Sequence, residues 1–397
     1  MITAGVGVGY GDDAHQAGVD ACLQAKTELG DAKPHLAIVL ASVEYDQEAV
    51  LAGVRSISGD TLLVGSSTAG EITTNGPVDR HSVVIMLLSS EHVSFWAGVG
   101  EGISESATEA GRKVAIAVTE QTDEALKTFI MFPDVLVGNG ADIVRGALEE
   151  LGPHFPLVGG ASGDDFRFEK TYQYLNDKVY SGTVVGVGIS GDCTFGIGVK
   201  HGWIPIGMPK KVTKAEGSVL HELDEKPAIS VYEDYFGEEG AKELKEKTLA
   251  QLAITYPLGM KVEGSDEMLI RDPITVDEHG SITCAAEIPE GSEIQLMVGS
   301  REEAVKVAEI AAQSAVEQLE GVKPSAVIIF NCIARNKLFG ERSGDEIEAI
   351  QRAVGAETPL IGFYTYGEQA PLGGEVRNIE KCNPAFHNET VVILTLA

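Results

Sequence analysis

The strongest constraint on the fold of this chain is an internal repeat with three clear copies, at about residues 1–90, 92–191 and 293–397. Each copy runs through a glycine-rich strand, a helix, a buried strand, a second helix, a glycine-rich turn and a last strand. A chain that repeats this order has to bury the same apolar faces in each copy. We therefore predict an α/β protein of repeated β-α-β-α-β-β units, with mixed sheets flanked by helices.

The copies agree in local detail as well as in order. A small polar residue opens the first helix of each copy, followed three positions later by Gln or Glu, which is the pattern of a helix N-cap. The next strand is apolar on both faces, as in "LAIVLAS", and such runs are typical of strands covered by helices. The capping pairs are Asp13 with Gln16, Ser106 with Glu109, and Ser300 with Glu303. The first strands are predicted at residues 2–11, 93–102 and 294–300.

Residues 192–292 match the repeat less well, and we interpret them as a diverged fourth unit. This interpretation gives two pseudo-symmetric domains of two units each, at residues 1–200 and 201–397, joined near the segment "WIPIGMPKKVTK". Within the diverged unit, "DEHG" at residues 277–280 is predicted as the turn of a β-hairpin.

The charge of the chain excludes several classes of partner. It holds 60 acidic and 30 basic residues, for a formal net charge of −30. Such a surface repels nucleic acid and anionic membranes, so we expect it to bind neither. No signal peptide or membrane span is predicted, and the five scattered cysteines form no C-x-x-C pair, which favours a reduced cytoplasm. The histidines show no metal-ligand spacing, and no metal is expected.

The glycine-rich turns are the first candidates for a binding site. Gly65, Gly70 and Glu71 of "GSSTAGE" correspond to glycines and a glutamate in "GFYTYGE", which ends in Glu368. The first glycine is expected to give a sharp exit from the strand, and the second a left-handed conformation or a close approach of the backbone. A phosphate-binding loop would carry Lys where Glu71 stands, so phosphate is not expected. Because ligands of parallel sheets bind at the carboxyl ends of strands, these acids are predicted to line a site.

The third copy adds further polar residues at the same edge. Arg335 lies in an insertion that follows a buried strand. Its guanidinium suits a ligand carboxylate, and the carboxylate of Glu368 suits a ligand ammonium. The neighbouring aromatic rings suit the body of the ligand. Together these groups predict a site for an amino acid or a similar small zwitterion. The predicted ligand-binding residues are Arg335, Glu368, Tyr366, Cys332, Tyr364, His387, Asn388, Glu71, Ser67, Thr68, Asp164 and Asp165.

Each candidate could instead have a structural role. The acids can cap the turns that follow them, and Arg335 can pair with a nearby acid to hold its loop. Cys332 can fill a buried strand end, and His387 can be a hydrogen-bonded structural histidine. Catalysis has weaker support, since only a Cys332–His387 pair offers a nucleophile with a base, and we expect a binding protein and not an enzyme.

At these residues the chain resembles the FIST proteins, which pair a FIST N domain with a FIST C domain. "VGSSTAGEI" resembles the N-domain signature, which often has cysteine where Ser66 stands here. "FNCIARNKLFG", "PLIGFYTYGEQAP" and "HNET" resemble the closing motifs of the C domain, with Glu389 where glutamine is usual. The resemblance covers nearly the whole chain.

The resemblance implies a cytoplasmic sensory module of signal transduction that binds small ligands such as amino acids. Because the two domains use up the length of the chain, we expect it to signal through a separate partner, such as a kinase or a cyclase. Some FIST-type proteins are described as haem-binding nitric oxide sensors, so a haem sensor is the second hypothesis, with His201 or His387 as the axial ligand; otherwise no cofactor is expected. A Cys332-dependent enzyme is the third hypothesis, and a pure interaction scaffold is the fourth.

Overall fold

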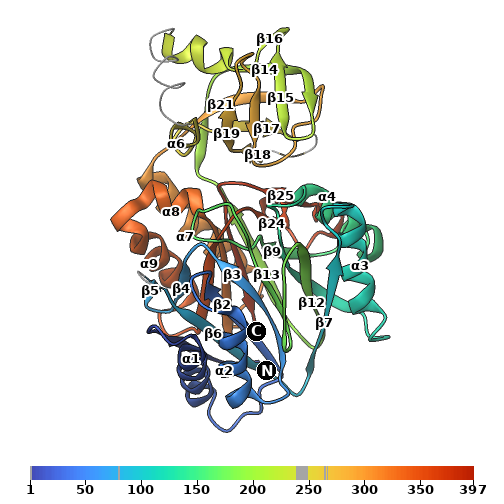
Figure 1. Cartoon of the computed structure of the whole chain (residues 1–397), viewed down its shortest axis with the longest axis vertical. Helices are drawn as coiled ribbons and strands as arrows, with labels where there is room; N and C mark the ends of the chain where they lie inside the picture. The colour runs from blue at the N-terminus through green and yellow to red at the C-terminus, as the bar shows by residue number, and fades with distance from the viewer. Residues whose placement is uncertain (1, 79–80, 238–248, 263–264, 266) are drawn as a thin grey trace.

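The computed structural model describes residues 2–78, 81–237, 249–262, 265 and 267–397. It has a large α/β body with a smaller lobe of β-strands above it (Figure 1). The body contains three sheets of six strands, each covered by helices on its outer side. The predicted class, α/β with mixed sheets flanked by helices, is confirmed.

The first unit folds in the predicted order. Its middle strand pairs in parallel with the third strand and antiparallel with the last one. Its elements are β1 (Thr3–Gly9), α1 (Ala14–Leu29), β2 (Leu36–Ser42), α2 (Gln47–Ser58), β3 (Leu62–Thr68), β4 (Glu71–Thr73), β5 (Gly76–Pro77) and β6 (Val83–Ser89).

The second unit has the same connectivity and the same pairing of its middle strand. Its elements are β7 (Val93–Glu101), α3 (Ala107–Thr119), β8 (Leu126–Pro133), α4 (Gly140–Leu151), β9 (Leu157–Gly160), β10 (Gln173–Leu175), β11 (Lys178–Tyr180) and β12 (Thr183–Gly191).

The third unit differs from the prediction at its start. Its first strand is β13 (Phe195–Lys200), which pairs antiparallel with the last strand, β26 (Val391–Leu396). Residues 294–300, the predicted first strand, lie instead in the upper lobe. The other elements are α7 (Arg301–Glu317), β22 (Ala326–Cys332), α8 (Ile333–Phe339), η1 (Gly340–Arg342), α9 (Ser343–Val354), β23 (Leu360–Thr365), β24 (Glu368–Pro371), η2 (Leu372–Gly374), η3 (Ile379–Lys381) and β25 (Pro384–His387).

The upper lobe is inserted between the first strand and the first helix of the third unit, and it corrects the prediction of a diverged α/β unit. Its described strands pair antiparallel throughout and enclose an apolar core of their own. The predicted hairpin is confirmed, since Asp277 at its turn accepts the amide N–H of Ser281 at 2.8 Å. The elements are β14 (Trp203–Glu216), β15 (Val219–Leu223), β16 (Lys226–Pro227), α6 (Leu249–Ala253), β17 (Leu258–Lys261), β18 (Met268–Arg271), β19 (Pro273–Val276), β20 (Ile282–Cys284) and β21 (Glu293–Gly299).

The three units are locked together by an exchange of short strands. The hairpin β4–β5 of the first unit adds to β23 of the third, and β24–β25 of the third adds to β9 of the second. The hairpin β10–β11 of the second unit closes the cycle on β3 of the first. Each glycine-rich turn therefore leads from its own sheet into a neighbouring one, which brings residues of different units together.

The apolar core follows from this arrangement. The inner faces of the three sheets pack against one another, and the outer faces pack against the helices. Asp13, Ser106 and Ser300 accept the N–H of the residue three positions on, so these predicted N-caps are confirmed. Among the described residues, no helix combines the length and apolar character that a membrane span needs.

Candidate functional site

The glycine-rich turns begin later than predicted. Strand β3 continues past Gly65 as far as Thr68, and a Cβ at Gly65 would lie 1.8 Å from the carbonyl oxygen of Val39. Gly65 is thus required for close approach of the neighbouring strand and not for a sharp exit. Gly65 has a φ of 156°, and the second glycine also has a positive φ, 123° at Gly70 and 152° at Gly367. The glutamate that follows it opens the exchanged strand.

Glu71 and Glu368 have equivalent environments. Each carboxylate accepts the hydroxyl three residues before it, from Thr68 or Thr365, and a second hydroxyl, from Ser82 or Thr390. Burial raises the pKa of Glu71 to about 8 and that of Glu368 to about 7.

The two glutamates differ in their access to a pocket. A pocket of about 990 Å³ is lined by residues of all three units, and Glu71 lines it whereas Glu368 does not. Four carboxylates and one imidazole contribute to its wall, and the described residues that line it include no Lys or Arg. Those residues are Tyr10, Gly11, Asp12, Ser42, Ala69, Gly70, Glu71, Pro77, Val78, His81, Asp165, Asn336, Gly340, Glu341, Ser343 and Tyr364.

The predicted pair of Arg335 with a ligand carboxylate is not what the structure shows. The Arg335 guanidinium is fully buried and forms an ion pair with Glu346, also fully buried. It also donates to the backbone carbonyls of His201 and Ala304. A buried guanidinium with these partners anchors α8 and the loop around it, so Arg335 has the structural role of holding its loop.

Several predicted binding residues of the turns hold the exchanged loops together. Asp164 accepts three backbone N–H groups, from residues 168–170, and the hydroxyl of Tyr366. Ser67 donates to the carbonyl of Gly163 and accepts the amide of Tyr172. The side chains of Asp164 and Ser67 are therefore engaged in hydrogen bonds within the protein, and so is the hydroxyl of Thr68, which donates to Glu71.

The predicted residues near the last strand are also buried. Burial raises the pKa of the Cys332 thiol well above 9, with a further contribution from Glu368, which disfavours a thiolate nucleophile. His387 lies 2.9 Å from the carbonyl oxygen of Ala370, and burial lowers its pKa to about 4. The Oδ1 atom of Asn388 is buried without a partner among the described residues. None of the three lines the acidic pocket.

His201, the other predicted axial ligand, faces a different environment. Its Nδ1 accepts the amide N–H of Trp203 at 3.0 Å, and burial lowers the pKa of its imidazole to about 4. It is not among the residues that line the acidic pocket.

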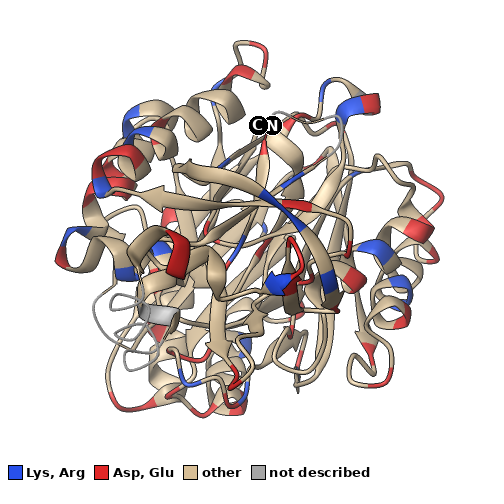
Figure 2. Ribbon diagram, turned by 90° about the horizontal axis from the view of Figure 1, so that it is seen from above, with Lys and Arg blue, Asp and Glu red and all other residues tan. Residues whose placement is uncertain are grey.

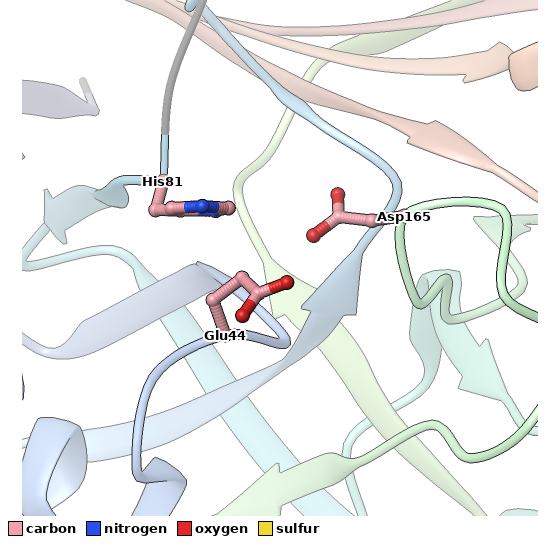
Figure 3. A group of neighbouring side chains, drawn as sticks. All are labelled: Glu44, His81 and Asp165. Carbon is pink, nitrogen blue, oxygen red and sulfur yellow. The ribbon is translucent and has the colours of Figure 1, made fainter.

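The structure thus brings together three of the predicted residues, Glu71, Asp165 and Tyr364, and adds others that the sequence analysis missed. Ser42 ends β2 and Glu44 follows it. A search for polar residues after buried strands, as for Arg335, would have found both. Together with His81, which precedes β6, they surround Asp165 (Figure 3).

The surroundings of the pocket reflect the charge of the chain. Asp and Glu are spread over the helices and loops around the outside of the molecule, and Lys and Arg also mark strands near the middle of the view (Figure 2). Burial raises the pKa of Asp165, and the hydrogen bond from Ser42, then the nearby His81 and Lys337, partly offset this effect. The pocket is therefore a place where negative charge is concentrated and only partly compensated.

Curated relatives and one solved structure are similar to this chain over most of its length. The chain is 26% identical over 376 residues to an uncharacterized protein of Mycobacterium tuberculosis, covering 93% of this chain and 95% of that one. It is 27% identical over 341 residues to an uncharacterized protein of Methanocaldococcus jannaschii, covering 77% of this chain and 64% of that one. A crystal structure of a chorismatase covers 100% of this chain and 99% of its own, at 9% identity and a TM-score of 0.38.

Two domain families match most of the chain. The FIST N domain matches residues 35–226, and the FIST C domain matches residues 228–371. The boundary between the two matches falls within the upper lobe, at β16. FIST domains are small-ligand sensory domains of signal transduction. The chain therefore belongs to the FIST family and carries its N and C domains in succession.

Proposed function

We propose that this protein is a sensor whose acidic pocket binds the ammonium group of an amino acid or a similar small zwitterion. The observation that carries the proposal is the composition of the pocket wall, since its described lining residues include Asp12, Glu71, Asp165 and Glu341 but no Lys or Arg. An ammonium group has three N–H donors and no acceptor, so a wall of carboxylates suits it.

The opposite end of the ligand would meet neutral donors. Asn336, Ser343 and Tyr364 line the side of the pocket that the third unit provides. Their amide and hydroxyl groups can donate to a carboxylate without a formal charge. These residues take the part that the sequence analysis gave to Arg335.

The protonation of Glu71 would make ligand binding depend on pH. With a pKa of about 8, its carboxyl group is mostly protonated at pH 7. An ammonium beside it favours the charged form, so binding should release a proton and tighten as the pH rises from 6 to 8. Signalling would then pass to a protein partner such as a kinase or a cyclase, in keeping with the sensory role of the family.

The test is a thermal-shift screen with amino acids and primary amines, and with matched carboxylic acids that lack the amine, followed by titration calorimetry. We expect saturable binding of an amine-bearing ligand that weakens at least about tenfold in Glu71→Gln, a loss of about 1.4 kcal/mol or more. Glu368→Gln is the matched control, because it changes the equivalent carboxyl outside the pocket. Equal binding by both variants, or no binding of any amine, would refute the site.

A further inference from the structure

Three metal-ligand side chains from separate segments meet at the rim of the acidic pocket. Glu44 follows β2, His81 precedes β6, and Asp165 lies in the loop after β9. One ligand atom of each lies within 4.8 Å of those of the other two. Figure 3 shows the imidazole and the two carboxylates gathered around a common space.

We propose that Glu44, His81 and Asp165 bind a divalent transition-metal ion, for which Zn²⁺ is the probe. An imidazole nitrogen with two carboxylate oxygens is a donor set that suits zinc, whereas magnesium prefers oxygen ligands alone. Three protein ligands leave coordination positions open for a bound molecule. This proposal adds a metal to the pocket, which the sequence analysis did not expect.

Ser42 is placed to orient two of the ligands. Its Oγ lies 3.1 Å from Nδ1 of His81 and 3.2 Å from Oδ2 of Asp165. A hydroxyl that donates to Asp165 can accept from Nδ1–H, and the imidazole then carries its free lone pair on Nε2, where a metal can bind. Hydrogen bonds of this kind from outside the ligand set fix the tautomer in metal sites.

An independent observation indicates that the pocket accommodates a bound molecule. The hydroxyl of Tyr364, which lines the pocket, is buried and has no hydrogen-bond partner among the described residues. The side chains of Asn336 and Ser343 lie beside it and partly offset the rise in its pKa, but neither forms a hydrogen bond of normal geometry with it. Buried hydroxyl groups are normally satisfied, so this one calls for an external partner.

A guanidinium competes with a metal ion for one of the three ligands. Arg167 forms an ion pair with Glu44, and both side chains are partly exposed, at 46% and 34%. Exposed ion pairs contribute little to stability, so a metal ion can displace the guanidinium.

The experiment is calorimetric titration of the whole chain, first freed of metal with a chelator, with Zn²⁺ and with Mg²⁺. We expect one Zn²⁺ per chain, weaker binding of Mg²⁺, and a loss of Zn²⁺ affinity of about tenfold or more in His81→Ala and in Asp165→Asn. His279→Ala is the matched control, since His279 is another exposed histidine beside a glutamate, on the turn of the upper lobe. It should leave the affinity unchanged.

Circular dichroism shows whether each variant is folded. If His81→Ala or Asp165→Asn is not, Glu44→Gln is titrated in its place. Zinc bound with equal affinity by the wild type and the folded ligand variants, or the absence of stoichiometric binding, would overturn the proposal. Glu71→Gln separates the two proposals, because it should lower the affinity for the amine-bearing ligand and leave the affinity for Zn²⁺ unchanged. Zinc without amine binding would refute the proposed function alone, and amine without zinc binding would refute the metal site alone.

Discussion

Replacing Glu368 by glutamine should stabilise the protein at neutral and alkaline pH. The carboxyl group of Glu368 is fully buried, and burial raises its pKa from 4.5 to about 7 despite two threonine hydroxyls and the nearby charge of Arg335. Glutamine has the same shape and no charge to desolvate. Its amide can still accept from Thr390 and can donate to the hydroxyl of Thr365.

The expected size follows from the pKa. The folded protein holds the Glu368 proton more tightly than the unfolded chain, so stability is present at low pH and is lost as the pH rises from about 4.5 to about 7. At about 1.4 kcal/mol per unit of pKa, the loss amounts to about 3 kcal/mol. Glu368→Gln should therefore match the wild type near pH 4 and exceed it by about 3 kcal/mol above pH 7.

The assay is denaturant unfolding of both proteins at several values between pH 4 and pH 8. Glu109→Gln is a control of opposite sign. In the wild type, hydrogen bonds from Arg112 lower the pKa of the exposed Glu109 carboxylate, so this group contributes more to the stability of the protein as the pH rises. A difference between Glu368→Gln and wild type that stays constant with pH would refute the reasoning, as would a variant less stable than wild type at pH 8.

Two further substitutions test the buried polar groups. Arg335→Met should destabilise the protein by about 3–5 kcal/mol, because it leaves the carboxylate of Glu346 buried without its partner, whereas Arg145→Met at an exposed ion pair should cost less than about 1 kcal/mol. Equal losses in denaturant unfolding would contradict the structural role of Arg335. Glu389→Gln should raise the melting temperature at pH 7, because both carboxylate oxygens of Glu389 are buried without partners among the described residues and the nearby Asp272 raises its pKa further. A lower melting temperature would show that the charge is needed.

The sequence predicted the three units because their order of elements, caps and buried strands is local information. Residues 294–300 were misassigned because they are a strand followed by a capped helix, as in the other copies. Only the pairing of β13 with β26 shows that the first strand of the third unit lies about a hundred residues earlier in the chain. An insertion between a strand and its helix cannot be recognised from the periodicity of either element.

The candidate site was predicted in part. Ligands of parallel sheets bind at the carboxyl ends of strands, and this rule selected Glu71, Asp165 and Tyr364, which line one pocket. It also selected Arg335, whose partner Glu346 lies in the next helix. Both glutamates open an exchanged strand and both are buried, but Glu71 lines the pocket and Glu368 does not. No local pattern distinguishes two turns that share the same glycines, threonine and glutamate.

The most direct test of the account is the affinity of an amine-bearing ligand for Glu71→Gln and Glu368→Gln, measured side by side with the wild type. The two substitutions make the same chemical change in equivalent turns, and only Glu71 faces the acidic pocket. If the acidic pocket holds the ammonium group, Glu71→Gln weakens binding at least about tenfold, a loss of about 1.4 kcal/mol or more, and Glu368→Gln leaves it unchanged. A loss of binding in Glu368→Gln with full binding in Glu71→Gln would contradict a site at the acidic pocket.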